Sequence, residues 1–244
     1  MLVSIVTIVK DNKNFISQTL ESILNQSYKN IELIVIDGGS KDFTDIIVKK
    51  YFKEFKFISR IDDNVYKGIN FAHKVAKGEY LTFLHSGDIY LDKNVIANFV
   101  KNSNKNDILT SNILYFDSNL DVKRIWKVNT NQKFYNNSYK YPHTSFFYSS
   151  KIYKNFFYDE SLKISSDSKF LNILSKKNIS HKHLNFFSIC MFHKGLSTKF
   201  STFFKRTIED LRYLKEQNKY LFLFFYLKKI LEKLKQFKIN RVIN

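Results

Sequence analysis

The stretch Gly78-Glu79-Tyr80-Leu81-Thr82-Phe83-Leu84-His85-Ser86-Gly87-Asp88 decides the fold of this chain. A short apolar and aromatic run bounded by glycines is typical of a strand covered on both faces, as in parallel sheets flanked by helices. Ligands bind beyond the carboxyl ends of such strands. There Gly87 would allow a tight turn, and Asp88 would offer a hard oxygen ligand for a divalent cation holding a diphosphate. On this stretch alone, an ordinary turn with an acidic residue is an equal alternative.

The first hundred residues alternate strand and helix patterns. Apolar strands are predicted at residues 2–9, 31–36 and 55–59, and the first helix would be capped by Asp11 or Asn12. Gly78 is predicted to end the helix that precedes the strand quoted above. Repeated strand and helix units with short loops imply a parallel, three-layer sheet.

The second strand ends at Asp37-Gly38-Gly39-Ser40. Because parallel strands end at the same edge of a sheet, Asp37 and Asp88 are predicted to share that edge. One carboxylate could hold a base or ribose, and the other a metal and a diphosphate. Asp37 could instead serve only to form the turn beside its two glycines.

Beyond Asp88 the pattern becomes mixed, with a helix near 92–101 and strands at 108–116 and 122–128. From Arg206 the chain is helical by pattern, and it carries a basic amphipathic helix. We therefore expect one domain over residues 1–205, with a first half (1–100) and a second half (101–205) that the family resemblance described below assigns to the nucleotide sugar and to the acceptor, followed by a helical tail (206–244). The apolar face of that helix is predicted to contain Leu223, Leu227, Ile230, Leu231, Leu234 and Phe237.

Composition limits the location and the partners of the protein. The formal net charge is +18, but the lysines are spread along all 244 residues, so the charge indicates anionic partners in general and does not favour nucleic acid. The single cysteine permits no intrachain disulfide. No run approaches the roughly 20 apolar residues of a spanning helix. We expect a cytoplasmic protein, peripheral at the inner face of the cell membrane if the basic helix docks there.

In these motifs the chain resembles inverting family 2 glycosyltransferases of the GT-A fold, a Rossmann-like α/β fold, over most of residues 1 to 200. In the first half the matching residues are Val3 to Thr7, Thr19 to Glu32, Asp37 to Ser40, Asp42, Thr44, Asp62, Tyr66, Asn70, Ala76 to Tyr80 and Ser86 to Asp88. In the second half they are Pro142-His143, Phe146-Phe147, Asp159-Glu160, Asp167 and Gly195 to Thr198.

The resemblance implies a role for each matching site residue. It assigns Asp88 to a metal, Mn or Mg, that bridges the phosphates of a nucleotide-diphosphate sugar, with UDP as the expected nucleotide. It assigns Asp167 to the catalytic base, which removes the proton of an acceptor hydroxyl. The residues that it places around the nucleotide sugar are Thr7, Asp37, Gly38, Asp62, Asn70, Ser86, Gly87, His143 and His193.

Several of these assignments have structural alternatives. Asp167 could be a helix cap within Ser165-Ser166-Asp167, and His143 and His193 could be partly buried histidines with hydrogen-bond partners. His193 is expected in a loop at the donor site, and His143 on the acceptor side. His85 stands where the family often has Asn or Asp, so Asp88 would be the only carboxylate of the motif.

The function expected from the resemblance is sugar transfer with inversion to a glycan or lipid-linked glycan acceptor in surface polysaccharide biosynthesis. The alternative is a non-catalytic basic module that binds anionic membrane or nucleic acid. A sugar nucleotidyltransferase would need a glycine-rich basic loop after the first strand, which Thr7-Ile8-Val9-Lys10-Asp11 lacks. The sequence is compatible with contact with an anionic membrane and with a homodimer.

Overall fold

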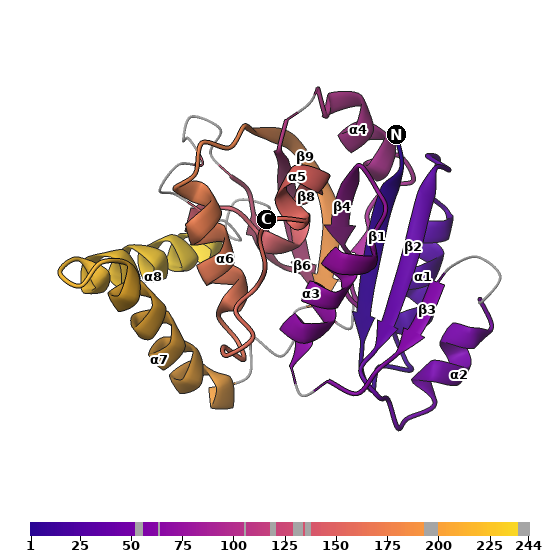
Figure 1. Ribbon diagram of the computed structural model, residues 1–244, viewed down its shortest axis with the longest axis horizontal. Helices are drawn as coiled ribbons and strands as arrows, with labels where there is room; N and C mark the ends of the chain where they lie inside the picture. Colours follow the sequence, from indigo (N-terminus) through magenta and orange to yellow (C-terminus); the bar gives the residue numbers. More distant parts are fainter. Residues whose placement is uncertain are drawn as a thin grey trace.

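In the computed structural model, a nine-stranded sheet runs through the chain with helices on both faces (Figure 1). One face is covered by α1 (Ile16–Leu24) and α4 (Val95–Asn102), and the other by α3 (Val65–Val75) and α6 (Ser166–Ser175). The structure describes residues 1–51, 56–62, 64–104, 106–117, 121–128, 134, 138–192 and 200–238, with only the backbone of 200–203, 217 and 235–238.

The first four strands confirm the predicted parallel arrangement. β1 (Val3–Val9) pairs with β2 (Ile31–Asp37) on one side and with β4 (Tyr80–Phe83) on the other, and β3 (Lys56–Ser59) extends the sheet beyond β2. All three pairings are parallel. The carboxyl ends of β2 and β4 therefore lie at one edge of the sheet, on either side of β1. The short helix α2 (Thr44–Lys49) lies between β2 and β3 in the sequence.

The second half is mixed, as its pattern predicted. β8 (Phe147–Ser149) runs antiparallel to both β4 and β6 (Ile108–Phe116), so β6 again ends at the edge where β4 ends. The remaining strands are β5 (Ile89–Tyr90), β7 (Val122–Trp126) and β9 (His181–Phe192). The remaining short helices are η2 (Ser138–Lys140), η3 (His143–Ser145) and α5 (Ser150–Tyr153). The predicted α/β fold class, a central sheet flanked by helices, is confirmed.

The carboxyl-terminal segment folds as a hairpin of α7 (Phe200–Gln217) and α8 (Phe222–Lys238) that packs against α6 (Figure 1). Buried polar groups join the hairpin to the rest of the chain. The Glu209 carboxylate accepts hydrogen bonds from the backbone N–H groups of Lys163, Ile164 and Ser165 at 2.8 to 3.0 Å. Lys229 donates to Asp210 and to Ser168 of α6 at 2.8 and 3.0 Å.

The predicted cap of the first helix was wrong, and the reason bears on the site. α1 begins at Ile16, and Phe15 rather than Asp11 or Asn12 is its N-cap residue. Asn12 instead donates its side-chain amide to the backbone oxygen and hydroxyl of Ser86, at 3.0 and 2.8 Å. These hydrogen bonds join the loop between β1 and α1 to the turn that carries Asp88.

Gly78 is required by close packing and does not adopt the left-handed conformation of a helix-ending glycine. A Cβ atom there would lie 2.5 Å from the backbone nitrogen of Ser4 and 2.5 Å from the carbonyl oxygen of Tyr80. Backbone atoms cannot yield as side-chain ends do. We expect Gly78→Ala to lower the free energy of unfolding by at least about 2 kcal/mol in urea denaturation.

Gly68→Ala is the matched control for that measurement. A Cβ at Gly68, inside α3, would meet its neighbours at 3.6 Å or more, which is ordinary contact. Removing a glycine from a helix interior should therefore leave stability equal or raise it by about 0.5 to 1 kcal/mol. Equal unfolding midpoints for Gly78→Ala and the unmodified protein would contradict the close approach.

Candidate active site

Asp37 lies at the end of β2, buried in its own turn. Its carboxylate accepts hydrogen bonds from the backbone N–H of Ser40, at 3.1 Å, and from the Ser40 hydroxyl. Gly38 donates its N–H to the carbonyl oxygen of Val9, at 2.8 Å. The turn-forming role that the sequence allowed for Asp37 is thus present, and a role toward a nucleotide stays a prediction.

Asp62 follows β3 and forms a paired contact with Arg60. The ion pair from Arg60 Nε to Asp62 Oδ2 is 2.7 Å, and Arg60 Nη2 donates to Asp62 Oδ1 at 3.0 Å. The guanidinium also stacks on the Phe71 ring, at 4.3 Å from its centroid. The carboxylate is therefore held rigidly beside α3.

Two predicted donor contacts, Thr7 and Asn70, are buried within the protein. Thr7 is fully buried on β1, and among the described residues its hydroxyl has no hydrogen-bond partner. The Asn70 amide donates to the carbonyl oxygen of Tyr158 and to the Glu160 carboxylate, and it accepts the N–H of Tyr158, all at 2.8 to 2.9 Å. These contacts give Asn70 a structural role, fastening the segment 158–160 to α3, and a contact with the donor stays a prediction.

The turn that carries Asp88 is pinned from α1. Gly87 has a φ of +100°, a conformation that favours glycine. Its N–H donates to the Thr19 hydroxyl, which in turn donates to the carbonyl oxygen of Asp88, both at 2.9 Å. With Asn12 holding Ser86, the turn is fixed on both sides, and the Asp88 side chain is placed at the edge of the sheet.

The Asp88 carboxylate fits a divalent cation. It is only 7% exposed, and burial raises its pKa to about 7 although the backbone N–H of Phe192 acts in the opposite direction. A buried carboxylate without a compensating cation is costly, so a bound metal would relieve that cost. His85 of the same motif is neutral, because burial and the neighbouring His143 lower its pKa to about 4. The described residues hold no cluster of three or more carboxylate, histidine or cysteine ligands. Further ligands would come from a diphosphate and water.

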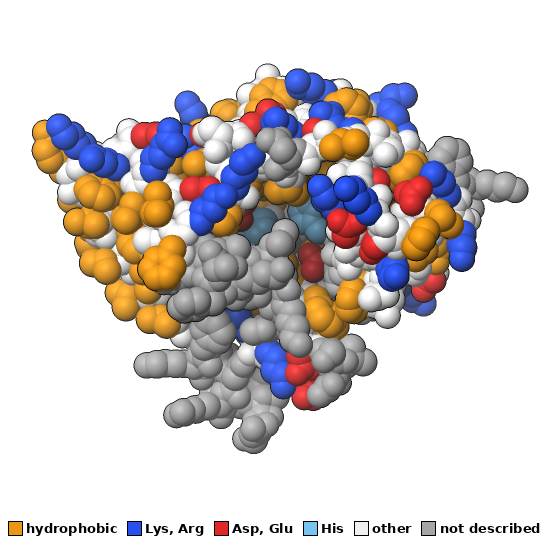
Figure 2. Space-filling model, turned by 90° about the horizontal axis from the view of Figure 1, so that it is seen from below, with side chains coloured by type: hydrophobic (Ala, Val, Ile, Leu, Met, Phe, Trp, Pro, Cys, Tyr) orange, Lys and Arg blue, Asp and Glu red, His pale blue; other side chains and the backbone are white. Residues whose placement is uncertain are grey.

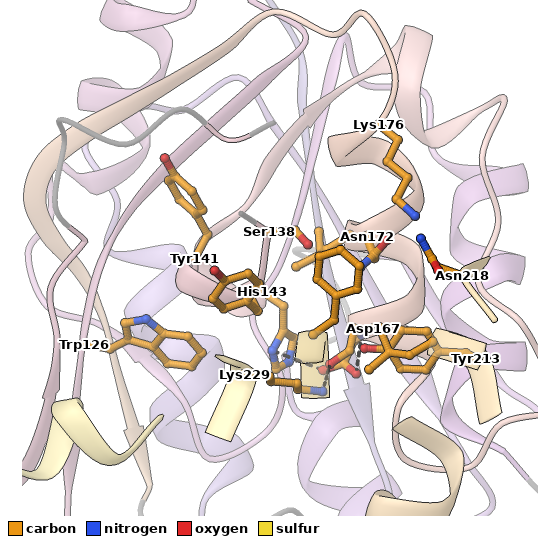
Figure 3. A pocket seen from close by; sticks show the side chains of 15 residues that line it. Trp126, Ser138, Tyr141, His143, Asp167, Asn172, Lys176, Tyr213, Asn218 and Lys229 are labelled. Carbon is orange, nitrogen blue, oxygen red and sulfur yellow. Dashed lines mark hydrogen bonds and ion pairs between the residues drawn. The ribbon is translucent and has the colours of Figure 1, made fainter. Parts of the chain in front are cut away.

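Asp167 lies in the first turn of α6, opposite His143 of η3. Asp167 Oδ2 lies 3.2 Å from His143 Nδ1, and Oδ1 accepts the N–H of Ser168 at 2.7 Å (Figure 3). The sequence also allowed Ser165-Ser166-Asp167 to cap this helix. The N-cap residue of α6 is Ser165, but its side chain forms no capping hydrogen bond. Glu209 accepts the Ser165 N–H instead. The Asp167 carboxylate is therefore oriented by His143 and is 21% exposed.

Tyr115 lies within electrostatic range of both Asp88 and Asp167, and it was not singled out from the sequence. Burial raises its pKa to about 12, and Asp88 and Asp167 both add to the rise. The Arg124 guanidinium stacks on its ring at 4.6 Å. The signal that could have found Tyr115 is its position at the carboxyl end of β6. His193, in contrast, lies outside the described residues.

A parallel sheet with acidic turns at its carboxyl edge, followed by a mixed half that supplies a third carboxylate, defines an α/β nucleotide-binding enzyme domain. A family model described as glycosyl transferase family 2 matches residues 4–162, more than half of the chain. The chain belongs to glycosyl transferase family 2.

Curated relatives and solved structures agree with this assignment. The chain is 28% identical over 179 residues to the minor teichoic acid biosynthesis protein GgaB of Bacillus subtilis, covering 66% of this chain and 19% of the relative. It is 43% identical over 94 residues to the UDP-Glc:alpha-D-GlcNAc-diphosphoundecaprenol beta-1,3-glucosyltransferase WfaP of Escherichia coli, covering 37% of each. The chain spans well under half the length of these relatives.

Two solved structures share the fold. S. aureus TarS in complex with UDP-GlcNAc matches with a TM-score of 0.65 at 18% identity, covering 88% of this chain and 67% of that one. The mannosyltransferase PcManGT from Pyrobaculum calidifontis, in complex with GDP-Man and Mn2+, matches with a TM-score of 0.61 at 11% identity, covering 88% and 63%. Within the described part of the chain, no helix has the length and apolar character needed to span a membrane.

Proposed function

We propose that this protein transfers a sugar, with inversion at the anomeric carbon, from a UDP-sugar to a hydroxyl of a glycan or lipid-linked glycan in surface polysaccharide biosynthesis. The observation that carries the proposal is the placement of Asp167. It is held by His143 on the second half of the fold, while Tyr115 interacts electrostatically with both Asp167 and Asp88. The names of the relatives support the donor and the acceptor class.

In this mechanism Asp167 acts as the general base. It takes the proton of the acceptor hydroxyl while that oxygen forms a bond to the anomeric carbon, and the bond from this carbon to the diphosphate oxygen breaks on the opposite face. His143 keeps the carboxylate in position through its Nδ1 contact. A Mn or Mg ion held by Asp88 would neutralise charge on the leaving diphosphate.

A panel of nucleotide sugars tests the donor. UDP release from UDP-glucose, UDP-galactose and UDP-GlcNAc would be measured with Mn2+ or Mg2+ and compared with release of GDP from GDP-mannose. We expect at least one UDP-sugar to be turned over and GDP-mannose to be inactive. Turnover of GDP-mannose alone would contradict the UDP assignment.

The α7–α8 hairpin supports peripheral attachment to an anionic membrane on the cytoplasmic face. α8 has an outward stripe of leucines that are 55 to 58% exposed, consisting of Leu223, Leu227, Leu231 and Leu234. Over residues 200–238 the chain carries ten Lys and Arg against four Asp and Glu. Figure 2 shows hydrophobic side chains gathered on the hairpin side, on the same face as the hollow in which histidine side chains are visible. Apolar side chains flanked by lysines are typical of interfacial helices.

We expect the double variant Leu227→Asp and Leu231→Asp to bind vesicles of phosphatidylglycerol and phosphatidylcholine at least about tenfold more weakly than the unmodified protein. Two exposed leucines, which docking would bury in the membrane, would be replaced by charges that the anionic surface repels. Cosedimentation measures the binding. Leu91→Asp is the control, because Leu91 is 40% exposed but lies outside the hairpin. Unchanged binding of the double variant would contradict docking through this surface.

A further inference from the structure

The pocket next to Asp167 is built by the second half of the fold together with the hairpin. Its wall contains Asp167 and His143 at one end, with Lys176 and Asn218 at the other (Figure 3). No residue before Trp126 lines it, so the turns of Asp37 and Asp88 are not part of it. A donor nucleotide held at those turns would leave this pocket free for the other substrate.

Aromatic rings from several elements line the pocket. They are Trp126 of β7, Tyr139 of η2, Tyr141, Tyr213 of α7 and Phe225 of α8. Trp126 is fixed in place, because its Nε1–H donates to the carbonyl oxygen of Lys140 at 2.8 Å. Pockets with aromatic walls and a few polar groups suit ligands that combine apolar faces with hydroxyls. Sugar rings are such ligands, since their C–H faces stack on aromatic rings.

One face of α6 sets the length of the pocket. Ser168, Leu171, Asn172 and Lys176 line it at helical spacing, starting beside Asp167. Lys176 is nine positions after Asp167, which corresponds to about 14 Å along a helix. A single sugar ring at Asp167 would occupy only part of that length.

Asn172 provides a separate sign of a missing ligand. Its side-chain oxygen is buried, and among the described residues it has no hydrogen-bond partner. An unpaired buried carbonyl costs about 1 to 3 kcal/mol. Because no group of the described residues pairs with this oxygen, it is available to accept a hydrogen bond from a hydroxyl in the pocket, beyond the ring that Asp167 would contact.

The Asp167 end is charged and rigid. Burial alone would lower the pKa of Lys229, but Tyr213, Asp210 and Asp167 raise it above its ordinary value. Lys229 donates to Asp210 and to Ser168. This cation, supplied by α8, therefore lies within electrostatic range of Asp167. The reacting end of the pocket is therefore distinct from its other, polar end at Asn172 and Lys176.

We propose that this pocket binds the acceptor as a glycan of at least two sugar units, with the terminal ring at Asp167 and the next unit at Asn172 and Lys176. The proposal rests on the glycosyltransferase function proposed above, and the hairpin acts in it as a wall of the acceptor site. It assigns the selectivity for acceptor length to Asn172 of α6 and to Lys176 at the C-cap of that helix, neither of which takes part in the transfer step.

Trp126 permits a direct test, because it is the only tryptophan of the chain and it lines the pocket. Its fluorescence would be followed during titration with methyl glycosides of glucose, galactose and N-acetylglucosamine and with disaccharides of the same sugars. We expect at least one disaccharide to bind about tenfold or more tightly than its methyl glycoside. Equal affinities throughout, or no change with any sugar, would overturn the proposal.

A matched pair of double variants assigns the second unit to its residues. Asn172→Ala with Lys176→Ala should weaken disaccharide binding about tenfold and leave methyl glycoside binding as it was. Lys177→Ala with Asn178→Ala removes the same side-chain types from adjacent exposed positions outside the pocket, and should change neither affinity. Equal losses in both pairs, or no loss in the first, would overturn the assignment.

These binding measurements are independent of turnover. Donor hydrolysis by the unmodified protein is measured separately and reports on the proposed function. Hydrolysis of a UDP-sugar without a preference for disaccharides would refute only the acceptor proposal. A preference for disaccharides without any hydrolysis would support the pocket and count against the proposed reaction.

Discussion

Asp167→Asn is expected to reduce sugar transfer by at least about a thousandfold, within the range that general base catalysis contributes. The amide has nearly the shape of the carboxylate and can keep the contact with His143, but it cannot accept the proton of the acceptor hydroxyl. The loss should therefore appear in kcat, with UDP affinity and the unfolding midpoint unchanged. Initial rates of UDP release with acceptor, together with calorimetric titration of UDP, measure both.

Asp121→Asn is a suitable control for this substitution. Asp121 is 63% exposed, and the ion pair that the structure shows for its carboxylate is with Lys123. Its replacement should leave transfer within about twofold, because surface ion pairs contribute little. Undiminished transfer by Asp167→Asn would remove Asp167 from the mechanism, while equal losses in both variants would point to a general effect of lost charge.

Asp88→Asn is expected to have a comparably large effect on transfer and to abolish the metal dependence of UDP binding. Asp88 is the only carboxylate of its motif, since His85 is a neutral imidazole there. An amide is a much weaker ligand for Mn2+ or Mg2+ than a carboxylate. UDP affinity would be titrated with and without Mn2+. A variant that still gained UDP affinity from Mn2+ would place the metal elsewhere.

The same substitution should stabilise the metal-free protein at high pH. The folded pKa of Asp88 is raised from 3.8 to about 7 by burial, so its contribution to stability is lost as the pH rises from about 4 to about 7. Three pKa units correspond to a limit of about 4 kcal/mol. The difference in free energy of unfolding between Asp88→Asn and the unmodified protein should therefore shift in favour of Asp88→Asn as the pH rises from 4 to 8. A constant difference across this range would contradict the raised pKa.

Much of the fold could be predicted from the sequence, because the local apolar patterns agree with the burial of these strands and helices in the folded protein. The parallel strands were marked by continuous apolar runs, and β6 (Ile108–Phe116) was predicted with the bounds that the structure has. The acidic turns at Asp37 and Asp88 were placed correctly at one edge, since parallel strand order fixes where carboxyl ends meet. Asp167 was predicted at the start of a helix, where it lies.

What could not be predicted depends on contacts between residues far apart in the chain. Glu209 and Lys229 hold α6 in place through hydrogen bonds to Ser165 and Ser168. Both are charged residues in a segment whose pattern suggested a surface helix. Asn70 fits a ligand-binding role by sequence, yet its hydrogen bonds join it to Tyr158 and Glu160 across 88 and 90 positions. No local periodicity reports such partners.

The stereochemistry of the reaction tests the central claim most directly. A UDP-α-sugar accepted in the donor panel would be incubated with the protein and Mg2+, and the newly formed anomeric proton followed by NMR before mutarotation. A single displacement with Asp167 as base predicts that the β-anomer appears first, whether the acceptor is a glycan or water. First appearance of the α-anomer would contradict inversion and the mechanism built on Asp167.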